Sequence, residues 1–241
     1  MATLNASDMS SPSYQAILLD LGFRDYKEVW ALQKQLLDHR AAQKLPDILI
    51  LVEHPHVITL GRKMKPEEFS FEGLPVYHVE RGGYATYHGP GQLVGYPIVS
   101  LQENDLDVHG YVRNLEELLI RAISDFKIAA ERREGYPGVW VSNRKLASIG
   151  IALNRWTTYH GFALNVNTDL SFFESIQPCG MDSSVMTSMK QLAGKEFDMG
   201  EVKDKVKTSF EEVFKKTLTP LMNKSLLEDC WQTRFATTDP A

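Results

Sequence analysis

Cys179 and Lys145 are the residues whose types suit covalent chemistry. Cys179 stands between Pro178 and Gly180, and a Pro/Gly turn can present a thiol to a pocket. A free thiol has a pKa of about 8.5, so a neighbouring cation or base must activate it at neutral pH. Lysine replaces histidine in some nucleophile–base pairs, so Lys145 could form a thiolate–ammonium pair with Cys179. A thiolate suits attack on a thioester, because thiol exchange is nearly isoenergetic.

Both residues also have plainer interpretations. A lone cysteine is more often a small buried hydrophobe, and Cys230 in "LLEDCWQ" fits that description well. By strict alternation along its strand, Lys145 shares a face with Ala147, Ile149 and Ile151. A lysine on such a face is more often an edge residue whose ammonium reaches water. Both alternatives stay open on these residues alone.

A second candidate site is the stretch "RGGYATYHGPGQLVGYP", residues 81–97. Its glycines would let a ligand approach the backbone. Arg81 supplies a fixed charge, and His88 can exchange protons near neutral pH. The alternative is a surface hairpin with ordinary turn glycines. The spacings GxGxxG and GxxxxGK[ST] are absent, so the stretch is no phosphate-binding fingerprint.

A third candidate region is the hairpin within residues 143–167. A turn centred on Asn154 and Arg155 would place Ser148 opposite Gly161 and Gly150 opposite Tyr159. Small residues would then meet across two strands where bulky residues are usual. Glycine inside a strand often marks the close approach of a ligand.

The elements that must position these residues follow from hydrophobic periodicity. Helical spacing of apolar residues predicts helices over 25–44, 107–126 and 199–218. Apolar runs and alternation predict strands over 14–22, 47–54, 56–62, 75–83 and 91–101, followed by a three-strand antiparallel meander from "GVWV", "KLASIGIAL" and "TTYHGFALNVN". Strands between separated helices indicate an α/β (α+β) domain with one central sheet.

Composition narrows the class of protein. The 241 residues suit one large domain, and the net charge of −5 argues against a general nucleic-acid binder. No apolar run is long enough to cross a bilayer, and the first residues lack the pattern of a secretion signal. Two distant cysteines, Cys179 and Cys230, predict neither a disulfide framework nor a metal site, and a reducing cytoplasm is the simplest setting.

Five motifs together resemble the lipoyl(octanoyl) transferases of protein lipoylation. They are "EHPHVITLGR", "RGGYATYHGPGQLVGYPI", "GVWVSNRKLASIGI", "HGFALNVNTDL" and "CGMDSSVMTSM", in this order. The pattern RGG-x-x-TYHGPGQ is specific, and its occurrence with the lysine and Cys-Gly motifs is more specific still. The resemblance covers most of the chain, from the first strand to about Met189.

The resemblance implies an activity and its partners. The family transfers an octanoyl group, or a lipoyl group, from acyl carrier protein to a lysine of a lipoyl domain. The acceptors are the lipoyl domains of 2-oxoacid dehydrogenase E2 subunits and the glycine cleavage H protein. No cofactor or metal is implied, and neither a nucleic acid nor a membrane is expected as a partner. Nothing in the sequence demands a dimer, so we expect a monomer.

The resemblance also assigns roles. Cys179 matches the acyl-thioester nucleophile, and Lys145 matches the residue that lowers the pKa of that thiol and serves as acid and base. The implied substrate-binding residues are Arg81, Gly82, Gly83, Tyr84, Ala85, Thr86, Tyr87, His88, Ser148, Ile149, Gly150, Gly161, Phe162 and Ala163. The implied fold is the biotin/lipoate protein ligase type, a single domain with a central mixed sheet flanked by helices. We expect a flexible N-terminus over 1–13, a catalytic domain over 14–219 and a C-terminal extension over 220–241.

Phe162 and a group of basic residues suggest how the substrates would bind. Phe162 stands where a smaller aliphatic residue is common in the family and would narrow the acyl pocket. Basic residues near the motifs would form a docking patch for an acidic carrier protein: Arg62, Lys63, Lys65, Arg144 and Arg155. The alternatives are an ATP-dependent lipoate or biotin protein ligase, in which Cys179 is structural, and a non-catalytic acyl-binding module. An octanoyl adduct on Cys179 would separate these classes.

Overall fold

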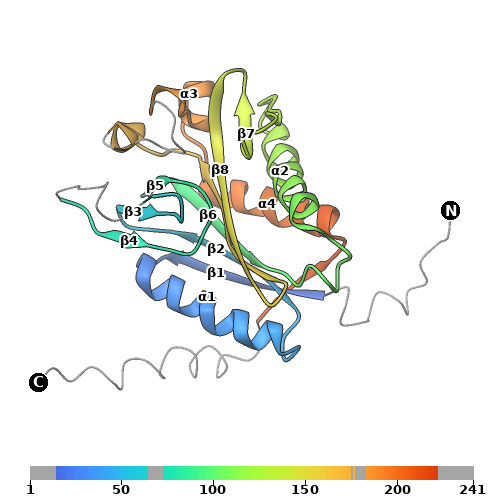
Figure 1. Cartoon of the computed structure of the whole chain (residues 1–241). Coiled ribbons are helices and arrows are strands. Elements are labelled where there is room, and N and C mark those ends of the chain that lie inside the picture. Colours follow the sequence, from blue (N-terminus) through green and yellow to red (C-terminus); the bar gives the residue numbers. More distant parts are fainter. Residues whose placement is uncertain (1–14, 65–72, 175, 177–182, 222–241) are drawn as a thin grey trace, which may run out of the picture.

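A large sheet with helices on both faces forms the frame of the computed structural model (Figure 1). The structure describes residues 15–64, 73–174, 176 and 183–221. The helices are α1 (Tyr26–Ala41), α2 (Val108–Ser124), α3 (Met189–Ala193) and α4 (Met199–Phe214), with 3-10 turns at Leu170–Phe173 and Ser183–Val185. The strands are β1 (Gln15–Phe23), β2 (Asp47–Glu53), β3 (Val57–Leu60), β4 (Val76–His78), β5 (Ala85–His88), β6 (Gln92–Ile98), β7 (Gly138–Val141), β8 (Arg144–Asn154), β9 (Thr157–Asn165) and β10 (Thr217–Pro220).

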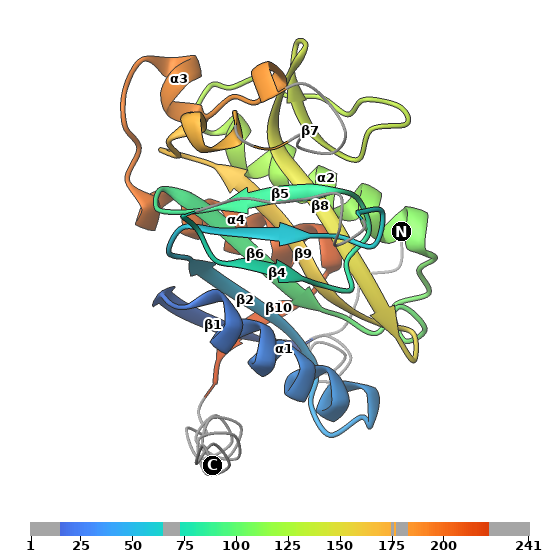
Figure 2. The same ribbon diagram turned by 60° about the vertical axis from the view of Figure 1, so that its left-hand side comes forward.

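The described strands form two sheets. The larger has seven strands in the order β10-β1-β2-β6-β9-β8-β7, with β1 parallel to both of its neighbours and the others antiparallel. The smaller has three strands in the order β4-β3-β5. In Figure 2 the smaller sheet lies in front of β6, β8 and β9. The predicted mixed central sheet and the β7-β8-β9 meander are confirmed, whereas the expectation of one sheet missed the smaller one.

The helices cover opposite faces of the large sheet and give it two cores. Apolar residues of α2 and α4 pack on one face, and those of α1 pack on the other. Strand β2 is covered on both sides, which explains why its sequence "DILILVE" is an almost unbroken apolar run. A third cluster fills the back of the small sheet and includes Tyr87, Phe173, Ile176 and Met186.

Helix α1 shows how the sequence sets an element that borders the site. Asp25 caps its N-terminus, and its carboxylate accepts from the backbone N–H groups of Lys27 and Glu28 at 2.8 and 3.2 Å. Val29, Leu32 and Leu36 follow at helical spacing and are buried. The cap therefore fixes where the helix starts, and its first residue, Tyr26, is buried.

The predicted third helix ends earlier than expected. Helix α4 stops at Phe214, because Lys215 adopts a left-handed conformation with φ of 53°. The chain then forms β10 beside β1, with Gln15 opposite Thr217. The last four residues predicted as helix are thus a cap and the start of an edge strand.

The β8–β9 hairpin has a different register from the predicted one. Its turn is centred on Arg155 and Trp156, both at positive φ, rather than on Asn154 and Arg155. Gly150 therefore lies opposite Gly161, and Ser148 lies opposite Ala163. The shift is two residues, so the β8 side chains that pair with β9, Ala147–Asn154, keep their predicted faces, but the two glycines now meet directly.

Candidate active site

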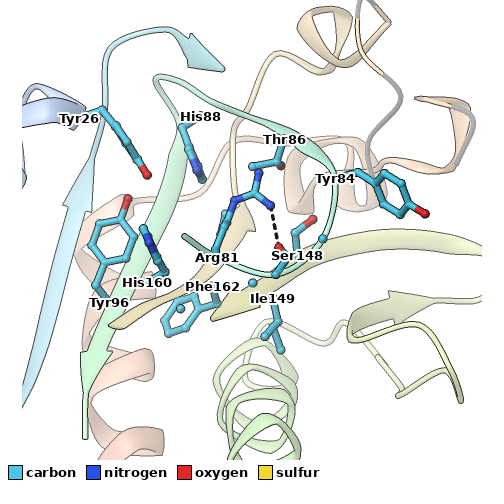
Figure 3. A pocket seen from close by; sticks show the side chains of 15 residues that line it. Tyr26, Arg81, Tyr84, Thr86, His88, Tyr96, Ser148, Ile149, His160 and Phe162 are labelled. Atoms are coloured by element: carbon cyan, nitrogen blue, oxygen red, sulfur yellow. Dashed lines mark hydrogen bonds between the residues drawn. The ribbon is translucent and has the colours of Figure 1, made fainter. Parts of the chain in front are cut away.

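A pocket lies between the residues 81–88 segment and strands β8 and β9 (Figure 3). Tyr26 at the start of α1 and Tyr96 of β6 complete its walls. The residues lining it are Tyr26, Arg81, Gly82, Gly83, Tyr84, Thr86, His88, Tyr96, Ser148, Ile149, Gly150, His160, Gly161, Phe162 and Ala163. Three segments far apart in the sequence therefore meet at one site.

The glycines around this pocket let residues 81–83, which follow β4, pack closely against neighbouring strands. A Cβ on Gly150 would lie 3.1 Å from Cδ of Arg81, and a Cβ on Gly61 would lie 2.5 Å from the carbonyl oxygen of Gly83. The backbone N–H of Gly82 donates to the carbonyl of Ile151 at 2.9 Å. The Arg81–Gly83 backbone thus packs directly against β8, where side chains would keep it away. This ordered contact excludes the surface-hairpin interpretation of the stretch.

Arg81 is a buried cation in the pocket wall. Its Nη2 donates to the carbonyl and hydroxyl oxygens of Thr59 at 2.7 and 3.0 Å, and its Nη1 donates to the carbonyl of Gly82 at 3.0 Å. These bonds hold the guanidinium in one position inside the site. A fixed charge there favours neutral forms of the nearby histidines.

His54 and Tyr96 form a neutral hydrogen-bonded pair behind the pocket. Nδ1 of His54 lies 2.8 Å from the carbonyl oxygen of Arg24, and Nε2 lies 2.9 Å from the Tyr96 hydroxyl. Because a carbonyl only accepts, Nδ1 carries the proton and Nε2 accepts from Tyr96. Burial lowers the pKa of His54 to about 4, so the ring is neutral at pH 7.

His88 is held by a chain of buried amides. Its Nδ1 donates to Oε1 of Gln92 at 2.7 Å, and Nε2 of Gln92 donates to Oδ1 of Asn165 at 2.9 Å. Nδ2 of Asn165 in turn donates to the carbonyl of Thr187 at 2.9 Å. That carbonyl fixes the orientation of both amides, and so the tautomer of His88. Burial, and then the charge of His54, lowers the pKa of His88 to about 3.

His160 occupies an unusual position in β9. Its φ is 57°, and its backbone N–H donates to Oε1 of Gln33 on α1 at 2.9 Å. Its Nε2 lies 3.4 Å from Glu80, which also pairs with Lys34 at 2.7 Å. Burial lowers the pKa of His160 below its usual value. The pair with Glu80 therefore anchors a neutral ring at the pocket edge.

Lys145 lies on the pocket side of β8, which corrects its predicted face. Val139 pairs with Ala147, but the next residue, Trp140, pairs with Lys145, so Leu146 is an extra residue in β8. Leu146 and Ala147 both enter the core under α2, and the bulge returns Lys145 to the opposite face. A Cβ on Gly138, which faces Ser148, would lie 2.7 Å from Cε of Lys145.

The predicted substrate-binding residues divide into two groups. Twelve of the fourteen line the pocket, and Ala85 and Tyr87 do not. These two point to the other face of β5, where they join the third core cluster, and the Tyr87 hydroxyl lies 2.7 Å from Nδ1 of His56. Cys179 lies outside the described residues.

Sequence reasoning missed three residues that line the pocket: Tyr26, Tyr96 and His160. Tyr26 directly follows the capping Asp25, so the predicted helix start was a usable signal. The other two belong to motifs that the resemblance already included, "VGYP" and "YHGFAL". Their contribution depends on strand pairing, which no single motif displays.

The proposed docking patch is split in the structure. Arg62 and Lys63 are exposed beside the pocket, and Nζ of Lys63 lies 5.4 Å from the ring of Tyr84. Arg155 instead forms an ion pair with Asp38, about 18 Å along α1 from the helix start at Tyr26. Arg144 is exposed at the β7–β8 turn, and Lys65 lies outside the described residues.

The comparisons with known proteins decide the family. The lipoyl protein ligase A/B catalytic domain matches residues 25–211. This chain belongs to that family. An octanoyltransferase of Syntrophotalea carbinolica is 47% identical over 208 residues, which cover 86% of this chain and 98% of the relative. An octanoyltransferase of Synechococcus elongatus is 43% identical over 210 residues, covering 85% and 90%.

Solved structures of this family share the fold at low identity. A lipoate-protein ligase A bound with ATP has a TM-score of 0.75 at 16% identity, over 93% of this chain and 97% of the other. A bipartite lipoate protein ligase from Thermoplasma acidophilum has a TM-score of 0.72 at 17% identity, over 92% and 94%. These matches confirm the predicted ligase-type α/β fold.

In the part of the chain that the structure describes, no group of three or more His, Cys, Asp or Glu side chains could hold a metal ion. None of the described helices combines the length and apolarity that a membrane crossing requires.

Proposed function

We propose that this protein transfers an octanoyl group from acyl carrier protein to a lysine of lipoyl domains through a thioester on Cys179. Octanoyl transfer rests on the curated relatives, which are named octanoyltransferases at 43–47% identity over most of the chain. The carrier-protein donor, the cysteine intermediate and the roles of single residues are the proposed part.

One observation carries the mechanism: the bulge at Leu146 directs Lys145 to the pocket side of β8, next to Ser148. A cation on this side lies at the edge of the space that would hold an acyl chain. It is therefore available to the thioester end of the substrate. A lysine buried in the apolar core under α2 would have no such access.

The chain around Cys179 supports the same assignment. Ile176 and Met186, which precede and follow it in sequence, both pack in the third core cluster with Tyr87. Met186 forms a bridge with Lys145, and the carbonyl of Lys145 accepts from the N–H of Thr187 at 3.0 Å. Met186 and Thr187, which follow Cys179 in sequence, are thus tied to the strand that contains Lys145.

The proposed reaction has two half-reactions and balances at each step. The Cys179 thiolate attacks the octanoyl carbonyl, the bond to the carrier sulfur breaks, and the leaving thiolate takes a proton from the Lys145 ammonium. The lipoyl-domain amine then attacks the acyl-enzyme, Lys145 takes the proton that the amine loses, and the Cys179 thiolate returns. Backbone N–H groups at the glycine-rich turns would stabilise the oxyanion.

The remaining assignments extend the same proposal. The family match over 25–211 supports a catalytic domain over 14–219, with 220–241 as an extension. The acceptors would be the lipoyl domains of E2 subunits and the glycine cleavage H protein. The setting would be the cytoplasm, and the protein would act as a monomer.

Intact mass spectrometry tests this function directly. Incubation with octanoyl-carrier protein, without ATP, should add one octanoyl group to the wild type and none to Cys179→Ser. Cys230→Ser is the matched control and should retain the adduct. A dependence on ATP and free octanoate would instead favour a ligase. Absence of any adduct and of any transfer would favour a binding module.

A further inference from the structure

Gly138 leaves room for the side chain of Lys145. It is the first residue of β7, lies opposite Ser148, and has a φ of 135°. A Cβ there would lie 2.7 Å from Cε and 3.4 Å from Nζ of Lys145, and 2.4 Å from the carbonyl oxygen of Ala147. The lysine side chain therefore runs directly over this glycine. Any side chain at this position would occupy its path.

Glu116 holds Gly138 from the other side. This carboxylate is buried on α2, on a helix face whose other buried residues are mostly apolar. Its Oε1 accepts from the backbone N–H of Gly138 at 3.0 Å, and its Oε2 lies 3.4 Å from Nε of Arg132. Burying a carboxylate costs free energy unless it is paired and hydrogen-bonded, and these two contacts offset that cost. The bond to Gly138 ties α2 to the start of β7.

The ring of Trp140 lies beneath the ammonium group of Lys145. This ring is fully buried, its Nε1 donates to the carbonyl of Tyr136 at 3.1 Å, and its centroid lies 5.4 Å from Nζ of Lys145. A cation over an indole face is attracted to it. Glu116, Gly138 and Trp140 thus surround the path of one side chain that starts at a bulge.

We propose that Glu116 and Gly138 are positioning residues for Lys145. Glu116 fixes the start of β7 against α2. Gly138 has no side chain, and this leaves room for the side chain of Lys145 on the pocket side of β8. The inference rests on the proposed function only where it predicts a loss of transfer. The placement of the side chain can be measured without any substrate.

The experiment reads position and activity separately. Lysine labelled with ¹³C at Cε reports the position of Lys145, because the neighbouring Trp140 ring shifts its resonance, and Lys145→Arg identifies that signal. The test variants are Glu116→Ala, Glu116→Gln and Gly138→Ala. Glu116→Gln keeps an oxygen that can accept from Gly138. The same proteins are assayed for kcat and KM in octanoyl transfer.

Two neighbours provide matched controls. Gly135→Ala alters a glycine in the loop that precedes β7, also at positive φ, with open space where a Cβ would stand. Glu117→Ala removes the adjacent carboxylate, which pairs with Arg121 and Arg132 on the exposed side of α2. Both controls should leave the Lys145 resonance in place.

We expect Gly138→Ala and Glu116→Ala to move the resonance and to lower kcat on the order of 100-fold, because displacement of a reacting group by about 1 Å costs that much. KM for the carrier protein should stay within roughly twofold, and Glu116→Gln should restore most of the rate. If the resonance moves but transfer persists, the positioning stands and the role of Lys145 in the proposed function falls. If the resonance stays in place in Glu116→Ala, or moves equally in the controls, the inference is overturned. Glu116→Ala decides the question even if Gly138→Ala does not fold.

Discussion

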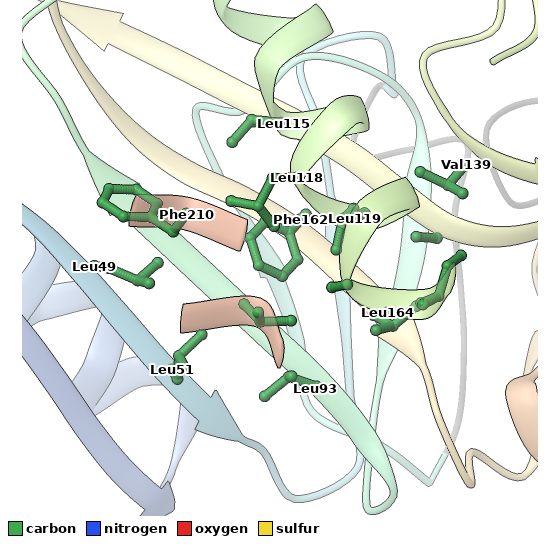
Figure 4. Close-up of a cluster of buried hydrophobic side chains, with 14 of the residues drawn as sticks. Leu49, Leu51, Leu93, Leu115, Leu118, Leu119, Val139, Phe162, Leu164 and Phe210 are labelled. Atoms are coloured by element: carbon green, nitrogen blue, oxygen red, sulfur yellow. The ribbon is translucent and has the colours of Figure 1, made fainter. Parts of the chain in front are cut away.

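Phe162 should limit the length of the acyl chain that this protein transfers. Its ring lies against Gly95, where a Cβ would be 2.1 Å from Cζ of Phe162. The residue lines the pocket and also packs among the leucines of the core under α2 (Figure 4). Gly150 and Gly161 also line the pocket and have no side chains to fill it, so the ring of Phe162 closes the pocket on the α2 side. Phe162→Leu should therefore lengthen the pocket.

The magnitude follows from the apolar surface that longer chains would bury. Each additional buried CH₂ contributes about 0.8 kcal/mol, which is roughly fourfold in binding. Two additional CH₂ groups would raise the ratio of kcat/KM for decanoyl over octanoyl by roughly 15-fold in Phe162→Leu. The substitution should lower the free energy of unfolding by about 1–2 kcal/mol, because the core loses part of a ring.

The assay measures transfer from carrier proteins loaded with octanoyl, decanoyl and dodecanoyl chains. Phe173→Leu is the matched control, since Phe173 is buried in the third core cluster and does not line the pocket. It should cost similar stability without changing the chain-length ratio. An unchanged ratio in Phe162→Leu, or an equal change in Phe173→Leu, would refute the reasoning.

Three further predictions concern the same elements. The pKa values of His54 and His88 are lowered to about 4 and 3, so the unfolded chain binds more protons below pH 6.5. The free energy of unfolding should be highest above that pH and fall by about 2 kcal/mol per histidine between pH 7 and 5, and His54→Gln should flatten this pH dependence in urea unfolding; a constant free energy of unfolding over this range would contradict the lowered pKa values. Gly95→Ala should destabilise the protein by about 1–3 kcal/mol through its collision with Phe162, and Phe162→Leu should relieve part of that cost; strictly additive effects in thermal unfolding would argue against this contact. The double variant Arg62→Glu, Lys63→Glu should raise KM for an acidic carrier protein by roughly tenfold at low salt, and about 0.5 M salt should reduce this effect. Arg155→Glu should change KM little. Equal effects of the two variants would show that the carrier protein does not dock at the pocket edge.

Periodicity predicted the elements of this fold, because each has a clear apolar pattern and a local end signal. Asp25 and Asp107 cap helices where the pattern begins, and the run in β2 reflects cover on both faces. The small sheet was missed because β4 and β5 have only three and four residues, and their partner β3 lies between them in space. The hairpin register was wrong because Asn154 favours a turn locally, whereas the actual turn places Arg155 and Trp156 at positive φ.

The residue on which the chemistry depends is the one that alternation misplaced. Counting by two from Ile149 puts Lys145 on the core side of β8, and that count holds only while β8 has no bulge. The sequence contained a signal, since Leu146 and Ala147 are consecutive apolar residues that a regular strand would send to opposite faces. In the structure both enter the core, and the bulge directs the lysine across Gly138 toward the pocket. The bulge can be removed from the partner strand, because one alanine inserted between Val139 and Trp140 would pair with Leu146 and restore one-to-one pairing. This insertion should return the lysine to the core side and abolish transfer more completely than Leu146→Ala, which keeps the bulge. Equal losses in the two variants would show that the access of Lys145 does not depend on the bulge.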